Sequence, residues 1–149
     1  MIDPDLIEKK LEKEKPYRLK QVRKLVFQDL IEDWDEATVL PLALRGGLNR
    51  DCPLDIEAKI LKEKDTAKAL IELKDGLKIE SVLMEHEDDR STVCVSSQVG
   101  CPVNCTFCVT GKLGFKRNLT RDEMVSQVLY ANNYIKKKFG KQEDGSLYS

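Results

Sequence analysis

Three cysteines lie within eight residues of this chain, in the run CPVNCTFC from Cys101 to Cys108. The spacing C-x3-C-x2-C, through Cys105, brings three thiolates into one short loop. Cysteine thiolates are the usual ligands of iron–sulfur clusters. Three such ligands on a cluster of about four irons leave one iron open, and an open iron can bind and activate a small molecule. The spacing therefore predicts an iron–sulfur site at Cys101, Cys105 and Cys108.

Zinc is the main competing metal for these thiolates. Structural zinc sites usually pair two C-x2-C knuckles and close with about four ligands. Only Cys105 and Cys108 have knuckle spacing, and neither a second knuckle nor a histidine pair follows them. The pattern favours iron–sulfur ligation, with zinc or unligated thiols as the alternatives.

The composition is that of a water-soluble globular protein. The 149 residues suffice for one average domain or two small ones, with 34% charged and 41% hydrophobic residues and a formal net charge of -1. The N-terminus is polar and acidic, unlike a signal peptide, and no apolar run approaches the roughly 18 residues of a membrane span. Five cysteines in such a chain indicate reduced thiols, so we expect a cytoplasmic protein without membrane contact.

The elements that precede the loop fall into two predicted parts. Residues 1–64 are predicted to form a helical domain, with Pro16 in the first turn of one helix. A second helix is predicted from Ala37 to Leu44, where Gly46 and Gly47 would stop it. Residues 65–90 are predicted as a β-hairpin and connector, because two alternating runs, 66–73 and 77–84, flank an Asp-Gly pair.

Residues 91–149 read as a strand, the cysteine loop and a helix. Residues 91–97 are β-prone, with Cys94 on one face. A helix is predicted to start at Thr120, since Glu123 completes a capping box, and to end at Gly140. One strand–loop–helix unit cannot bury its own faces, because parallel sheets are covered on both sides. We therefore expect an α/β fold whose last part is incomplete.

Longer stretches around the loop are more specific than the cysteines alone. The run CVSSQVGC at 94–101 and the run GFKRNLT at 114–120 resemble the RlmN/Cfr family of radical S-adenosylmethionine RNA adenosine methyltransferases, with the RlmN type favoured. The resemblance extends to EDDR at 87–90 and KPYR at 15–18. It implies a small N-terminal helical domain and hairpin, followed by the first unit of a truncated (β/α) barrel at 91–149.

The resemblance also implies cofactors and their sites. Cys101, Cys105 and Cys108 would hold a [4Fe-4S] cluster, and S-adenosylmethionine would bind its open iron. Phe107 matches an aromatic residue that packs near the adenine in the family, although the residue by itself is typical of a core. Cluster reduction implies an electron donor as a partner.

Two further residues match the family's catalytic positions. Cys94 matches a cysteine that resolves the protein–RNA adduct, and Glu80 matches a proton acceptor, through a connection one residue longer here. Taken without the family, Cys94 is typical of a buried strand residue and Glu80 of a solvated face. The cysteine that carries the methyl group in the family is expected to lie beyond this chain, so the chain alone is predicted to be inactive.

Local charge and the family together predict RNA contact. From position 112 to 121 there are four basic residues and no acidic one, including Lys116 and Arg117, which we predict to contact phosphates. The predicted reaction is methylation of adenosine C2 in 23S rRNA and tRNA by an enzyme that is monomeric when full length. The alternatives are a Cfr-type enzyme that methylates C8, and a non-catalytic RNA-binding or zinc-stabilised module.

Overall fold

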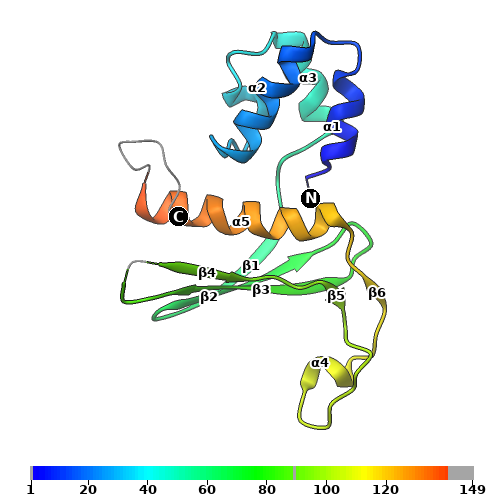
Figure 1. The fold of residues 1–149 in the computed structure, drawn as a ribbon, viewed down its shortest axis with the longest axis vertical. Helices are drawn as coiled ribbons and strands as arrows, with labels where there is room; N and C mark the ends of the chain where they lie inside the picture. The colour runs from blue at the N-terminus through cyan, green and yellow to red at the C-terminus, as the bar shows by residue number, and fades with distance from the viewer. Residues whose placement is uncertain (1, 89, 141–149) are drawn as a thin grey trace. The chain divides into compact units, whose positions relative to one another are not determined.

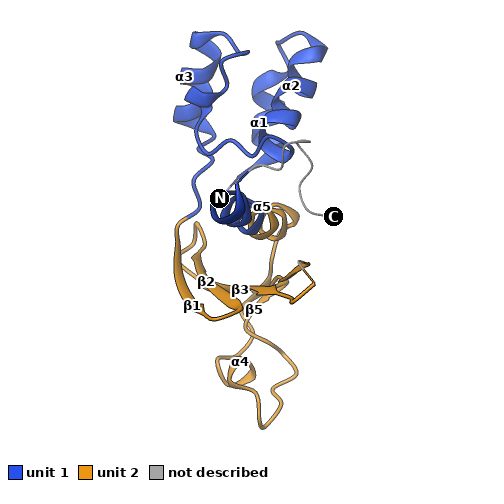
Figure 2. Cartoon of the chain, turned by 90° about the vertical axis from the view of Figure 1, so that its left-hand side faces the viewer, with its two compact units in different colours: residues 1–56, 129–149 blue, residues 57–128 orange. Residues whose placement is uncertain are grey.

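A computed structural model describes residues 2–88 and 90–140, and the chain forms two compact units (Figures 1 and 2). One unit comprises residues 1–56 and 129–149, and the other comprises residues 57–128. The helices are α1 (Pro4–Leu11), α2 (Pro16–Phe27), the 3-10 helix η1 (Trp34–Glu36), α3 (Leu42–Asp51), α4 (Val109–Lys112) and α5 (Arg121–Phe139). The strands are β1 (Ala58–Glu63), β2 (Thr66–Glu72), β3 (Lys78–Glu85), β4 (Ser91–Cys94), β5 (Gln98–Val99) and β6 (Arg117–Asn118).

The first unit is helical and has its own core. Pro16 begins α2, as predicted, where its missing N–H costs no helical hydrogen bond. Trp34 is fully buried, and its indole Nε1 donates to the carbonyl of Cys52 at 2.8 Å. Buried apolar side chains from α1, α2 and α3 complete this core, among them Ile7, Leu11, Val22, Leu25, Val26 and Leu48.

The helix predicted from Ala37 to Leu44 is wrong in its bounds. Helix α3 begins only after Pro41 and runs through Gly46 and Gly47 to Asp51. Proline disfavours helical backbone in the residue before it, which keeps the segment ahead of Pro41 out of the helix. Glycine ends a helix by adopting a positive φ, and neither of these two glycines does so.

The second unit is built on an antiparallel sheet with the strand order β1-β2-β3-β4. The predicted hairpin is confirmed: β2 and β3 pair throughout, and Gly76 takes a φ of +78° in the turn between them. The prediction of helix up to residue 64 is wrong for β1, whose mixed sequence forms a strand against β2. This segment is a strand because it pairs with β2, and the residue pattern of one segment does not show such pairing.

The two faces of the sheet differ in burial. On β2 and β3 the residues Ala67, Ala69, Ile71, Ile79, Ser81 and Leu83 are buried and alternate with more exposed ones. Glu80 therefore lies on the opposite, more exposed face. Cys94 is exposed at the end of β4, so its interpretation as a buried strand residue is wrong.

Helix α5 begins and ends as predicted. The backbone N–H of Glu123 donates to the Thr120 hydroxyl at 3.2 Å, and the Glu123 carboxylate accepts from the Thr120 N–H at 2.9 Å. Gly140 follows the helix with a φ of +77°. Among the described residues, no helix is long and apolar enough to cross a membrane. The mixed α/β class is confirmed, while every ladder between described strands is antiparallel and the parallel barrel stays a prediction.

Candidate metal centre

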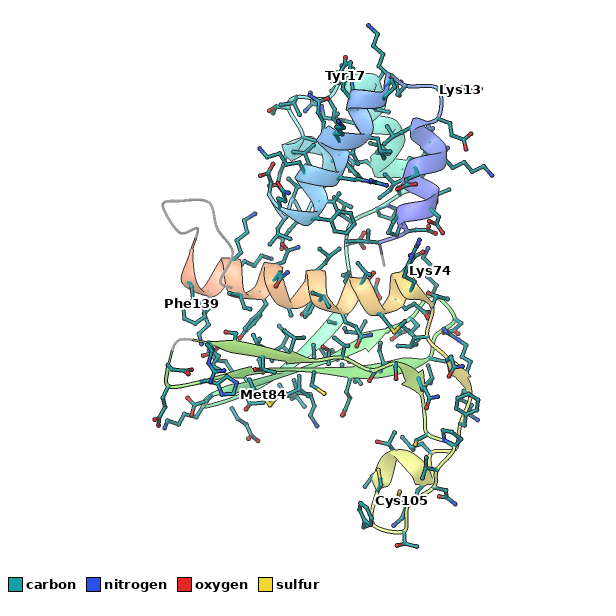
Figure 3. The ribbon with its side chains drawn as sticks, viewed as in Figure 1. Lys13, Tyr17, Lys74, Met84, Cys105 and Phe139 are labelled. Atoms are coloured by element: carbon teal, nitrogen blue, oxygen red, sulfur yellow. The ribbon has the colours of Figure 1, made fainter. Side chains whose placement is uncertain are left out.

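A two-stranded stem closes the cysteine loop. Strand β5 pairs with β6, so that Val99 lies opposite Arg117. Two further backbone bonds extend the stem: Lys116 N donates to Val99 O at 2.9 Å, and Leu119 N donates to Ser97 O at 2.8 Å. The segment that carries all three cysteines is therefore a loop whose two ends are held together by the β5–β6 pair (Figure 3, where Cys105 is labelled).

Two glycines allow the loop backbone to pack against itself. Gly100 has a φ of +74°, and a Cβ added there would lie 1.7 Å from the carbonyl oxygen of Gly114. A Cβ on Gly111 would lie 2.9 Å from the Cα of Asn104. Real Cβ atoms do not approach backbone this closely, so both positions require glycine in this geometry.

Cys101, Cys105 and Cys108 are each half-buried and free of disulfides. Cys108 N donates to Cys105 O at 3.0 Å, which makes a tight turn between two of them. Backbone N–H groups of Gly111 and Thr110 lower the pKa of the Cys108 thiol, because they stabilise its thiolate. Within residues 2–88 and 90–140, no three His, Cys, Asp or Glu side chains are placed closely enough to hold a metal ion.

The donor set fits an iron–sulfur cluster chemically. The loop offers three thiols, one of which is stabilised as a thiolate by backbone N–H groups, and such groups also tune iron–sulfur clusters. The three side chains are not gathered into a ligand set, so the loop supplies the ligands without a preformed cage.

The segment that carries the thiols also carries several exposed apolar side chains. Phe107 is 89% exposed, so its interpretation as a core residue is wrong for this structure. The other exposed apolar side chains of this segment are Val103, Val109, Leu113 and Phe115. Exposed apolar groups beside potential metal ligands can enclose a ligand that binds there and exclude water from it.

Glu80 and Cys94 share one face of the sheet. Val82 is the cross-strand partner of Cys94, so Glu80 is the diagonal neighbour of Cys94 across the β3–β4 ladder. The Glu80 carboxylate lies 3.4 Å from the Lys68 ammonium, and both side chains are about half exposed. The structure thus brings these two predicted residues together at the strand from which the cysteine loop begins.

Lys116 and Arg117, both predicted to contact RNA, differ in their surroundings. Lys116 is exposed. The guanidinium of Arg117 is engaged within the chain: it makes two bonds of 2.8 Å to the carboxylate of Glu123 and lies 2.7 Å from Asp75. These carboxylates raise the pKa of Arg117 further above its ordinary range, and Arg117 in turn lowers the pKa values of both.

The sequence gives no sign that Gln127 belongs near the site. Gln127 is fully buried on α5, and its amide binds both backbone groups of Ser96. A glutamine in an amphipathic helix gives no signal of its own, because its pattern is that of a solvent-facing residue. Only the fold shows that this position faces the end of β4.

Comparison with known proteins extends these observations. No family model matches the chain. It is 40% identical over 140 residues to a protein of Chlorobium phaeobacteroides named as a probable dual-specificity RNA methyltransferase RlmN. It is 42% identical over 128 residues to a protein of the same name from Thermotoga maritima. The chain resembles the RlmN methyltransferases.

The resemblance to RlmN covers most of this chain and a smaller part of its relatives. The two alignments span 87% and 83% of this chain, and 38% and 37% of the respective relatives. The chain therefore spans about two fifths of the length of the curated RlmN proteins that it matches. The predicted resemblance is confirmed over that part.

A solved structure agrees with the RlmN resemblance. A crystal structure of a radical SAM methyltransferase from Sphaerobacter thermophilus has a TM-score of 0.81 and 38% sequence identity. The match covers 92% of this chain and 42% of that chain. The mixed arrangement of helices and antiparallel strands is therefore one that a radical SAM methyltransferase contains.

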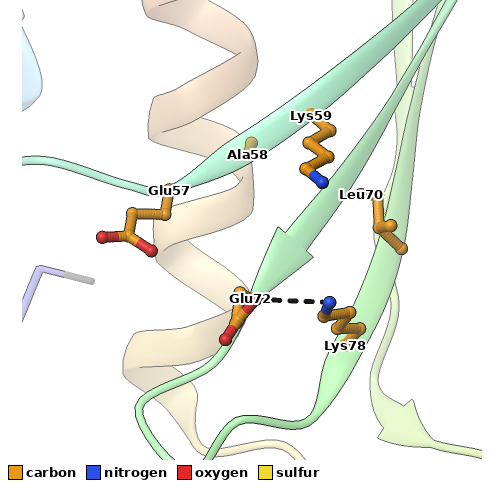
Figure 4. Close-up of a pocket in the computed structure, with 6 residues that line it drawn as sticks. All are labelled: Glu57, Ala58, Lys59, Leu70, Glu72 and Lys78. Carbon is orange, nitrogen blue, oxygen red and sulfur yellow. Dashed lines mark ion pairs between the residues drawn. The ribbon is translucent and has the colours of Figure 1, made fainter.

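A hollow of about 310 Å³ lies elsewhere on the RlmN-like sheet (Figure 4). It is lined by Glu57, Ala58, Lys59, Leu70, Glu72 and Lys78. Its charges balance, and the Lys78 ammonium lies 3.4 Å from the Glu72 carboxylate. The lining contains neither a cysteine nor Glu80, so the hollow is separate from the candidate metal centre.

Proposed function

We propose that this chain is part of a radical S-adenosylmethionine enzyme that methylates C2 of adenosine in 23S rRNA and tRNA. The observation that carries the proposal is the glycine-closed loop with three thiols, in a chain 40% identical to a protein named as an RNA methyltransferase. The TM-score of 0.81 to a radical SAM methyltransferase supports it.

The residues of the loop have distinct proposed roles. Cys101, Cys105 and Cys108 would hold a [4Fe-4S] cluster. When bound and reduced by an electron donor, that cluster supplies the electron that cleaves S-adenosylmethionine. Phe107 is proposed to cover the adenine of this cofactor, and its 89% exposure leaves its ring accessible for stacking.

Glu80 and Cys94 are proposed to act on the RNA adduct. Both lie on the exposed face at the β3–β4 ladder, so a bound adenine could reach a carboxylate and a thiol from one side. Glu80 would accept a proton from the adenine carbon, and the Cys94 thiol would take part in releasing the RNA. Lys116 is the more available of the two predicted phosphate contacts, because Arg117 is paired with Glu123 and Asp75.

We propose that none of the five cysteines of this chain carries the methyl group. Cys52 is buried, with 3% of its surface exposed, and the other four cysteines have proposed roles. We therefore propose that residues 1–149 alone do not methylate RNA. Separately, we propose that the full enzyme is a cytoplasmic monomer, as the family resemblance implies.

Metal analysis after anaerobic reconstitution tests the proposal. About four irons and about four sulfides per chain are expected, with a broad absorption band in the blue. Cys105→Ser should lower this content several-fold, whereas Cys94→Ser is the matched control and should keep it. Stoichiometric zinc, or iron that binds equally to the Cys105→Ser variant, would refute the cluster and favour a zinc-stabilised module.

The target carbon needs its own measurement. Nucleoside analysis of RNA methylated by the enzyme that includes this chain should show 2-methyladenosine. A product methylated at C8 would instead assign the chain to the Cfr type.

A further inference from the structure

Two buried polar side chains, those of Gln127 and Ser81, bond to backbone at and just beyond the end of β4. Within residues 2–88 and 90–140, the buried polar residues are Ser81, Ser126 and Gln127, and all three belong to the unit formed by residues 57–128. Burying an amide is unfavourable unless its donors and acceptor are paired. The bonds of Gln127 therefore show what this position does.

The Gln127 amide pairs with the backbone just beyond the end of strand β4. Its Oε1 accepts from the backbone N–H of Ser96 at 2.8 Å, and its Nε2 donates to the Ser96 carbonyl at 2.9 Å. Nε2 also donates to the carbonyl of Glu123, one turn earlier in α5, at 3.2 Å. Strand β4 ends at Cys94, so Gln127 supplies to Ser96 both of the bonds that a neighbouring strand would make.

The bonds between the Gln127 amide and the Ser96 backbone form what we call the clamp. Two serine hydroxyls connect this clamp to the proposed catalytic residues. Ser96 Oγ donates to the backbone carbonyl of Glu80 at 2.7 Å. Ser81 Oγ donates to the backbone carbonyl of Cys94 at 3.1 Å. These two hydrogen bonds join β3 to the end of β4 beyond the last ladder pair. Ser96 makes one of them, and Gln127 holds the backbone of Ser96.

We propose that Gln127 is a positioning residue, which holds Ser96 so that Glu80 and Cys94 keep their diagonal placement at the start of the cysteine loop. This inference rests on the proposed function of Glu80 and Cys94. Loss of the amide leaves the part-buried N–H and C=O of Ser96 without their partner. The end of β4 then frays, and with it the backbone at Cys94.

Amide hydrogen exchange in the chain with Gln127→Met tests the clamp directly. The Ser96 N–H should lose protection at least tenfold, while the N–H groups paired in β2 and β3 keep theirs within about threefold. Gln98→Met is the matched control, because the Gln98 amide bonds to the Asn118 side chain at 2.8 Å and is exposed. It should leave the Ser96 protection unchanged.

Gln127→Glu supplies a rescue that general destabilisation would not show. A protonated carboxyl group can donate to the Ser96 carbonyl and accept from its N–H, whereas a carboxylate cannot donate. Position 127 is fully buried, and burial raises the pKa of a carboxyl group, so the introduced group should be protonated at pH 5 and ionised by pH 8. Protection of Ser96, relative to the unsubstituted chain at the same pH, should therefore be near normal at pH 5 and fall severalfold by pH 8. Equal relative protection at both values, or its loss at both, would overturn the proposal.

A kinetic readout separates this inference from the proposed function. In the methyltransferase that includes this chain, Gln127→Met should lower kcat about tenfold with the KM for RNA within twofold, since the RNA contacts remain. An unchanged kcat would overturn the positioning role even if exchange increases. If the unsubstituted enzyme methylates no RNA, the proposed function fails, and the exchange result still reports on the clamp.

Discussion

Glu80 and Cys94 are diagonal neighbours on the exposed face of the sheet, across the ladder of β3 and β4. The relationship follows from the register, in which Val82 lies opposite Cys94. A carboxylate and a thiol on one open face can act on the same bound base. The cysteine loop begins a few residues after Cys94, so the β3–β4 ladder also positions the first end of that loop.

A catalytic role for Glu80 predicts loss of activity without loss of the cluster. Glu80→Gln removes the proton acceptor, so RNA methylation by the enzyme that includes this chain should fall at least tenfold with its iron content unchanged. Glu72→Gln is a close control, because Glu72 lies on the same sheet face and also has a lysine 3.4 Å away. Equal activities of the two variants would show that Glu80 is a solvent-facing residue without a catalytic role.

Gly100 is predicted to be essential for the loop stem. Gly100→Ala places a Cβ 1.7 Å from a backbone oxygen, so the stem must open and iron incorporation should fall severalfold. Gly76→Ala separates this clash from backbone strain, because Gly76 has a similar φ of +78° with open space around it. We expect Gly76→Ala to cost about 1–2 kcal/mol of stability and to keep full iron content. Equal iron content in both variants would contradict the close approach.

Arg117 is predicted to stabilise the second unit. Its side chain is 32% exposed and meets Glu123, which is 15% exposed, through two parallel bonds. Arg117→Met should lower the free energy of unfolding by about 1–2 kcal/mol, as measured in urea, and Arg117→Lys should recover only part because lysine cannot make the paired bonds. Arg121→Met is the control, since Arg121 is 65% exposed and should change stability by less than about 0.5 kcal/mol.

The same cluster predicts a dependence of stability on pH. Arg117 lowers the pKa values of Glu123 and Asp75 below their ordinary values of 4.5 and 3.8. Carboxyl groups with a depressed pKa in the folded state stabilise the fold above their unfolded pKa, and this stability is lost as the pH falls through the folded pKa. Urea unfolding between pH 7 and pH 3 should show the loss below about pH 4.5, and Arg117→Met should reduce it. An identical pH profile in both proteins would refute the link.

Local signals predicted the parts of the fold that local chemistry determines. The Asp-Gly turn, the capping box at Thr120 and the spacing of the cysteines each depend on a few adjacent residues, and the hairpin and helix α5 have the expected structure. Strand β1 and the late start of α3 depend on pairing with β2 and on the conformation before Pro41. Patterns within one segment do not contain that information.

The candidate site shows the same division. The spacing identified the three thiols, whereas the placement of Glu80 beside Cys94 follows from the strand register, which the sequence alone does not show. The clamp made by Gln127 and the pairing of Arg117 with Glu123 and Asp75 depend on contacts between distant segments. Both look like solvated polar residues in the sequence, and their bonding partners become known only from the fold.

The open iron is the central claim, and electron paramagnetic resonance of the reconstituted, reduced chain tests it most directly. A cluster held by Cys101, Cys105 and Cys108 alone leaves one iron for S-adenosylmethionine, so adding S-adenosylmethionine should shift the cluster signal. Cys105→Ser should give little or no such signal. A signal that is unchanged by saturating S-adenosylmethionine, or the absence of any cluster signal in the unsubstituted chain, would contradict the account.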